Sequence, residues 1–180
     1  MSSKNGFNAS ASVPGVAVDG CGAQNTYTLL PGDVAMGFDG DVLETLLGSC
    51  VSVILTDPRR TTGVMCHILH SLKAPAAEAN NTAYATQAMQ SLFALLRSVG
   101  IAPEMCEAFV YGGGNMFPQI FSKFHVGIGN ADWALDFLES HAIPVVEQSV
   151  GGAFYRKVRW SVGARSPQVV ETATHVSSNG

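Results

Sequence analysis

A cysteine that follows two small residues is the first feature of this sequence able to do chemistry. Gly48 and Ser49 precede Cys50, and the β-branched, apolar run Val51–Thr56 follows it. A Gly-Ser pair permits a tight turn, and such a turn leaves backbone N–H groups free to hold an oxyanion beside the thiol. A thiolate is a strong nucleophile, so Cys50 is a candidate catalytic residue. A structural cysteine buried at the start of a strand fits the same pattern.

A histidine on the next predicted strand supplies a candidate base. Two β-branched segments, residues 51–56 and 62–69, flank an Asp-Pro turn signal and predict a hairpin. This hairpin brings His67 close to Cys50 on adjacent antiparallel strands, where an imidazole can take the thiol proton. Because side chains alternate along a strand, we expect Cys66 on the opposite face, in the core.

A metal site is the alternative use of the same residue types. Nitrogen and sulfur ligands are offered by Cys66, His67, His70 and Cys106. Zinc ligands usually come as close pairs from two separate turns, whereas these four form one irregular cluster. The pattern therefore favours a site without a metal, and the chemistry of a thiol and an imidazole requires no organic cofactor.

A glycine-rich segment, YGGGNMF at residues 111–117, invites comparison with phosphate-binding loops. It lacks the Lys-Ser/Thr pair of a P-loop and the spacing of a dinucleotide-binding loop. We interpret it as a turn that ends a strand and packs close to another backbone.

Composition narrows the class of protein. The chain has 180 residues, which suits one domain with a hydrophobic core. Its net charge is −4 and no basic stripe stands out, so a nucleic-acid partner is not expected. No apolar run approaches the roughly 20 residues that span a bilayer, and no signal peptide is evident. We expect a cytoplasmic protein without membrane insertion.

The elements that must position these residues are mainly strands. We predict a disordered tail over residues 1–25, one domain over 26–165, and a flexible C-terminal tail over 166–180 that begins with a strand-like segment. The expected fold class is α/β (α+β), with a mixed or antiparallel β-sheet sandwich core flanked by about two or three helices. Further strands are predicted at residues 107–111, 143–148 and 156–162.

Two segments have the apolar spacing of helices. In residues 80–100, Asn81 or Thr82 is the expected N-cap. In residues 129–144, Asn130 is the expected N-cap. The buried face of this second helix is predicted to consist of Trp133, Phe137 and Leu138.

Several of these segments, taken in order, resemble one known family. The sequence is similar to the CheD family, the chemoreceptor glutamine deamidases, over roughly residues 28–165. The Gly-Ser-Cys turn with a histidine seventeen residues after the cysteine is specific as a pair. The resemblance rests on LLGSCVSVILTD (46–57), GVMCHIL (63–69), YGGGNMF (111–117), VGIGNADWALDFLESHAIPVV (126–146) and GGAFYRKVRW (151–160).

The resemblance implies an activity. Members hydrolyse the side-chain amide of particular glutamines on the cytoplasmic helices of chemotaxis receptors, giving glutamate and ammonia, and share their fold with the cytotoxic necrotizing factor deamidases. By this resemblance Cys50 matches the nucleophile, which forms a thioester, and His67 matches the base. The implied partners are chemotaxis receptors and a CheC-like phosphatase. A weakly catalytic or non-catalytic binding module that acts through such partners is the alternative.

One position departs from the family pattern. The family usually has a threonine six residues before the cysteine, where it orients the histidine, and here that position is Glu44. Thr45 follows one residue later, and we expect its side chain on the other face of an extended strand. Glu44 is therefore a candidate to hold the imidazole of His67, as the acid of a triad does. In the alternative, Glu44 points to solvent and a backbone carbonyl orients His67.

Overall fold

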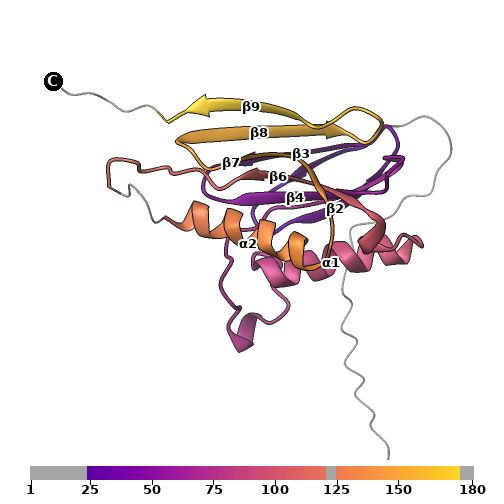
Figure 1. Cartoon of the computed structure of the whole chain (residues 1–180), viewed down its shortest axis with the longest axis horizontal. Coiled ribbons are helices and arrows are strands. Elements are labelled where there is room, and N and C mark those ends of the chain that lie inside the picture. Colours follow the sequence, from indigo (N-terminus) through magenta and orange to yellow (C-terminus); the bar gives the residue numbers. More distant parts are fainter. Residues whose placement is uncertain (1–23, 121–124, 175–180) are drawn as a thin grey trace, which may run out of the picture.

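Two stacked β-sheets form the centre of the protein, and two helices cover one of them. The computed structural model describes residues 24–120 and 125–174. One sheet has the strand order β1-β3-β8-β9 and the other the order β2-β5-β4-β6-β7. In Figure 1, β8 and β9 lie at the top, and α1 and α2 lie below the five-stranded sheet. The expected α+β sandwich flanked by helices is confirmed.

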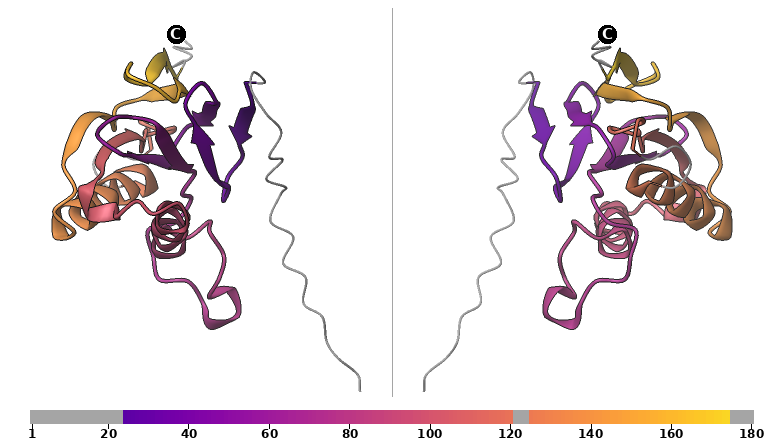
Figure 2. Two further views of the ribbon diagram at one scale, coloured as in Figure 1. Left: turned by 90° about the vertical axis from the view of Figure 1, so that its right-hand side faces the viewer. Right: turned by 90° about the vertical axis from the view of Figure 1, so that its left-hand side faces the viewer.

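The elements divide between the two sheets and the helical layer. The four-stranded sheet contains β1 (Thr26–Leu29), β3 (Val42–Leu47), β8 (Phe154–Ser161) and β9 (Gln168–Ala173). The five-stranded sheet contains β2 (Val34–Phe38), β4 (Val51–Thr56), β5 (Thr62–Cys66), β6 (Glu107–Gly112) and β7 (Val145–Val150). The helices are α1 (Ala85–Ser98) and α2 (Val126–Ser140), with short 3₁₀ turns at η1 (Ala76–Glu78) and η2 (Pro103–Met105). Both helices lie on the same side of the molecule, and the loop that carries η1 projects beyond them (Figure 2).

The central strands of the five-stranded sheet, β4, β5 and β6, are buried on both faces. One apolar cluster lies between the sheets and includes Ile54, Met65 and Trp160. A second lies between this sheet and the helices and includes Val53 and Cys66. Every residue of β4 is buried, which explains why its sequence is a continuous apolar run instead of an alternating one.

The predicted hairpin is present and its register is regular. Ile54 pairs with Met65 in the antiparallel ladder of β4 and β5, and Val51 forms an isolated bridge with Ile68 beyond the end of β5. The same register sets residue 52 opposite residue 67 and residue 50 opposite residue 69. The side chains of residues 50, 52 and 67 therefore share the face that turns toward the four-stranded sheet.

Both helices begin elsewhere than predicted. α1 begins at Ala85, so Asn81 and Thr82 lie in the preceding turn. There the Asn81 side chain accepts from the N–H of Ala83 (2.9 Å), and the Thr82 hydroxyl donates to the carbonyl of Gly32 (2.6 Å). These two hydrogen bonds stabilise the loop before α1, and the helix begins where the loop ends.

The start of α2 lies four residues before Asn130, at Val126, with His125 as its N-cap. The first turn contains Gly127, whose added Cβ would stand 2.5 Å from the carbonyl oxygen of Gly114. Close packing on another backbone thus holds a glycine in a helix despite its poor helix propensity. Of the predicted buried face only Leu138 is fully buried; Trp133 and Phe137 are half-buried.

The strand-like segment predicted at the start of the C-terminal tail is present. Residues 168–173 form β9, which pairs with β8 along its whole length and so is part of the four-stranded sheet. The predicted N-terminal tail, residues 1–25, lies almost entirely outside the described residues, and β1 begins at Thr26.

Candidate active site

The Gly-Ser-Cys turn joins one sheet to the other. β3 ends at Leu47, and after Gly48 and Ser49 the chain enters β4 of the second sheet, with Cys50 immediately before it. Cys50 is half-buried and packs against the edge of the apolar cluster between the sheets. The thiol therefore lies where the inter-sheet space opens to the surface.

The glycine-rich loop that follows β6 holds this turn from the other side. Gly113 donates its N–H to the carbonyl of Cys50 (2.8 Å), and Gly114 donates to the carbonyl of Gly48 (2.9 Å). Gly112 has a φ of +111°, and an added Cβ would stand 2.2 Å from the carbonyl oxygen of Cys50. The close backbone approach predicted for this segment is confirmed, and it requires glycine.

His67 is buried, and a threonine orients it. Its Nδ1 lies 2.9 Å from Oγ1 of Thr45, and that hydroxyl donates its single hydrogen to the carbonyl of Leu29 at 2.8 Å. With the hydroxyl hydrogen on Leu29, the hydroxyl oxygen accepts from the imidazole. We therefore assign the proton of His67 to Nδ1, which also lies 3.5 Å from the Leu29 carbonyl oxygen. Nε2 is then the unprotonated nitrogen, and it has no hydrogen-bond partner among the described residues.

Glu44 does not orient His67, so that prediction is wrong. Its carboxylate forms an ion pair with Arg159 and accepts from the hydroxyl of Thr28 (3.0 Å) on the outer face of the four-stranded sheet. The hydrogen bond from Arg159 lowers the pKa of Glu44. Strand alternation sends Thr45 to the opposite, inward face, where His67 lies.

Burial favours the neutral form of both the thiol and the imidazole. Burial raises the pKa of the Cys50 thiol and lowers the pKa of His67, because burial disfavours the charged form of each group. No hydrogen bond joins the two side chains within the part of the chain that the structure describes. The imidazole is therefore available as a proton acceptor during a reaction, without a preformed ion pair.

Two features beside the thiol suit a carbonyl substrate. The backbone N–H groups of Ser49 and Cys50 donate to no acceptor in residues 24–120 and 125–174. Next to Ser49 a mainly apolar cavity of about 540 Å³ opens, lined by Met116, Phe117 and Val126 among others. Free amide donors can hold an oxyanion, and a neighbouring apolar cavity can hold the rest of a substrate.

The four candidate metal ligands do not come together. Cys66 lies in the cluster on the helix side of its sheet, on the other face from His67. Among the residues described, no three His, Cys, Asp or Glu side chains converge on a point where a metal ion would bind. In the same residues, no helix is long and apolar enough to cross a membrane.

The fold and the site define an α+β sandwich protein with a half-buried thiol and a hydroxyl-oriented imidazole, the groups that cysteine-dependent hydrolases use. Residues 70–169 match the family model described as CheD chemotactic sensory transduction. The chain belongs to the CheD family.

Relatives in this family cover most of the chain. "Probable chemoreceptor glutamine deamidase CheD 2" from Albidiferax ferrireducens is 31% identical over 159 residues, which are 84% of this chain and 92% of the relative. "Probable chemoreceptor glutamine deamidase CheD" from Rhizobium rhizogenes is 38% identical over 130 residues, 71% of this chain and 69% of the relative. The protein of the same name from Hydrogenovibrio crunogenus is 30% identical over 146 residues, 79% of this chain and 75% of the relative.

One residue of the site, Thr45, is not among the residues that the sequence predicts for it, because its strand parity differs from that of Glu44. The alternation of Leu43, Thr45 and Leu47 was the available signal for Thr45, because a threonine between two inward leucines also points inward.

Proposed function

We propose that this protein is a cytoplasmic protein-glutamine deamidase that acts on chemotaxis receptors through a Cys50 thioester. Membership of the CheD family and the names of its relatives support the substrate class. The observation that carries the chemistry is the hydrogen bond between His67 Nδ1 and Thr45, because it leaves Nε2 as a free base on the face that Cys50 shares.

The first half of the reaction forms the thioester. Cys50 Sγ attacks the side-chain amide carbon of the glutamine while its proton passes to Nε2 of His67. The carbonyl oxygen becomes an oxyanion, which the free N–H groups of the turn stabilise. The C–N bond then breaks, and His67 returns the proton to the leaving nitrogen, so that ammonia departs.

The second half consumes water. His67 Nε2 removes a proton from a water molecule, whose oxygen attacks the thioester carbon. The C–S bond breaks, the thiolate of Cys50 takes the proton back from His67, and the product is a glutamic acid side chain. Starting from a neutral thiol and a neutral imidazole, one glutamine and one water give one glutamic acid side chain and one ammonia. In water the acid passes its proton to ammonia, which gives glutamate and ammonium.

Incubation with the cytoplasmic fragment of a chemotaxis receptor tests the proposal. We expect peptide mass spectrometry to find a mass gain of about one dalton at particular glutamines, with equimolar ammonia. The His67→Ala variant should give neither. If the parent protein binds the fragment or a CheC-like phosphatase but converts no glutamine, the protein is a regulatory binding module and the proposal fails.

A further inference from the structure

Asn130 of α2 makes hydrogen bonds to the chain beside both proposed catalytic residues. Its Nδ2 donates to the carbonyl of Ser49 (3.3 Å) and to the carbonyl of Leu69 (2.9 Å). Its Oδ1 accepts the N–H of Ser71 at 2.9 Å. The side chain is 1% exposed, so these three bonds take the place of bonds to water.

The side-chain amide of Asn130 bonds to the segment after His67 as the backbone of a neighbouring strand would. After Cys66 the chain leaves the regular ladder, and only the bridge at Ile68 still ties it to β4. A carbonyl at one residue and an N–H two residues later point to the same side of an extended chain, and Asn130 pairs with both of them at Leu69 and Ser71. The segment after His67 thus keeps a fixed course past the end of its strand.

The second N–H of the same amide sets the direction of the Ser49–Cys50 peptide. In a trans peptide the carbonyl and the following N–H point in opposite directions. Because the Ser49 carbonyl turns toward α2 to reach Asn130, the N–H of Cys50 turns away from α2 and stays without a protein acceptor. That N–H is one of the donors assigned above to the oxyanion.

We infer that Asn130 is a positioning residue that aims the Cys50 N–H at the developing oxyanion and holds the Cys50 and His67 segments in register. The inference rests on the proposed function for its catalytic consequence. That one buried side chain bonds to both segments does not depend on any activity. Aspartate is the informative replacement, because it has the same shape and keeps the acceptor for Ser71 but loses both donors.

The catalytic test compares turnover with thiol alkylation. For Asn130→Asp we expect kcat for deamidation to fall about 10- to 100-fold with little change in KM, since an oxyanion contact acts in the transition state. Alkylation of Cys50 by iodoacetamide develops no oxyanion, so its rate should change less than about threefold. Asn81→Asp, the same change at an exposed amide of the loop before α1, should leave both rates unchanged.

Amide hydrogen exchange tests the geometry without using activity. We expect exchange in segments 46–52 and 67–72 to rise in Asn130→Asp while β8 keeps its protection. If Asn130→Asp does not fold, the measurement uses Asn130→Ser, which adds no charge. Unchanged exchange in both segments would overturn the inference, as would equal losses of turnover and alkylation. If the parent converts no glutamine, the proposed function fails, and the exchange result alone decides the role of Asn130.

Discussion

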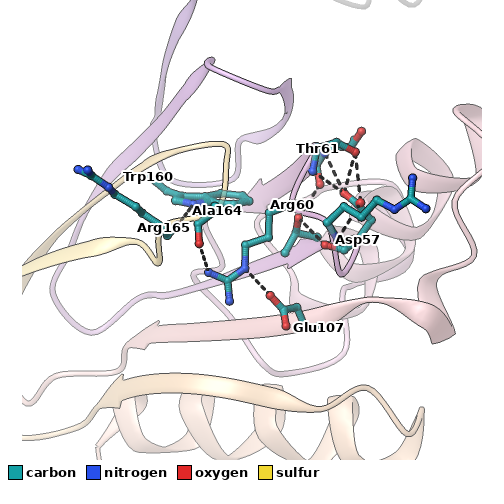
Figure 3. A network of polar contacts seen from close by, with 10 residues as sticks. Asp57, Arg60, Thr61, Glu107, Trp160, Ala164 and Arg165 are labelled. Carbon is teal, nitrogen blue, oxygen red and sulfur yellow. Dashed lines mark hydrogen bonds and ion pairs between the residues drawn. The ribbon is translucent and has the colours of Figure 1, made fainter.

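The two ends of the β4–β5 hairpin differ in how their polar groups are paired. The closed end is the turn that follows β4, and the open end is the end that carries Cys50 and His67. At the closed end, the carboxylate of Asp57 accepts the N–H groups of Arg59, Thr61 and Thr62 at 3.1, 2.8 and 2.9 Å, and also the Thr61 hydroxyl. Figure 3 shows this network. Because Arg60 also donates its N–H to the carbonyl of Asp57 at 2.8 Å, every backbone N–H from residue 59 to residue 62 has an acceptor in Asp57.

Arg60 shows how completely the closed end is held. It has a φ of +56°, which is unfavourable for a residue with a Cβ. Its guanidinium pairs with Glu107 at 2.6 Å and donates to the carbonyl of Ala164 at 3.0 Å, and it lies over the ring of Phe109. These contacts from two other parts of the chain offset the backbone strain.

The open end keeps polar groups without partners. Within the described residues, Nε2 of His67 and Oγ of Ser52 are buried and unpaired, and the N–H of Cys50 has no acceptor. An unpaired buried polar group costs about 1–3 kcal/mol. Within this hairpin, the unpaired polar groups lie at the end where a substrate can supply the partner, while the other end supplies stability; a third buried unpaired side-chain atom of the described residues, Oε1 of Gln87, lies on α1.

The largest expected effect is the loss of the thiol at the open end. Cys50→Ala should abolish deamidation and leave the fold intact, because the covalent route disappears while the residue is only half-buried. Mass spectrometry of a receptor fragment measures the activity, and circular dichroism checks the fold. Cys66→Ala, on the other face of the sheet, should instead lower stability and keep turnover. Full activity of folded Cys50→Ala would end its assignment as nucleophile.

The next largest effect concerns the orientation of His67. Thr45→Val removes the hydroxyl at nearly constant shape, and we expect turnover to fall about 10- to 100-fold because the imidazole loses its partner at Nδ1. Thr45→Ser should keep most of the activity. Glu44→Ala, which changes only the outer face, should turn over at close to the parental rate. A larger loss in Glu44→Ala than in Thr45→Val would reverse our assignment.

At the closed end the expected effect is on stability alone. Asp57→Ala removes the acceptor of four hydrogen bonds, and at about 0.5 kcal/mol each in a partly exposed turn the loss is about 2 kcal/mol. Urea denaturation measures it. Turnover below the unfolding transition should stay parental, because this turn lies at the far end of the hairpin. A fall in kcat with unchanged stability would show that the two ends are coupled.

The protonation state of Cys50 can be followed by measuring its alkylation rate as a function of pH. Because burial raises the pKa of Cys50, the thiolate fraction and the alkylation rate should rise about tenfold per pH unit from about pH 6 to pH 8. Burial raises the pKa of Cys66 to about 12, so Cys66 should react last. If the alkylation rate of Cys50 no longer rises with pH around neutral pH, the two residues form a thiolate–imidazolium pair instead of a neutral pair.

The smallest effect is expected at Ser52. Its hydroxyl is fully buried and unpaired in the described structure, so Ser52→Ala should leave stability unchanged or raise it by up to about 1 kcal/mol. Val53→Ala on the neighbouring, purely apolar face is the matched control and should be clearly destabilising. A loss of turnover in Ser52→Ala without a loss of stability would add this hydroxyl to the catalytic groups.

The sequence by itself determined the hairpin and the pair of residues that it carries. The apolar run of β4, the turn at Asp57 and the spacing of Cys50 and His67 are local signals, and their outcome depends on strand alternation and turn chemistry alone. The sandwich class followed from the same strand patterns. Three strands, β1, β2 and β3, are not predicted as elements, because these strands gain their stability from neighbours that are distant in sequence.

Only the tertiary structure decided which side chains complete the site. Thr45 reaches His67 because the inward face of β3 lies over the hairpin in the other sheet, a relation between sheets that strand parity alone does not contain. Asn130 reaches both segments because glycines 113, 114 and 127 let α2 approach the loop closely enough for one side-chain amide to bridge them. Contacts of this kind depend on how layers stack, and the residue types at those positions are equally compatible with a helix cap or a solvent-facing strand.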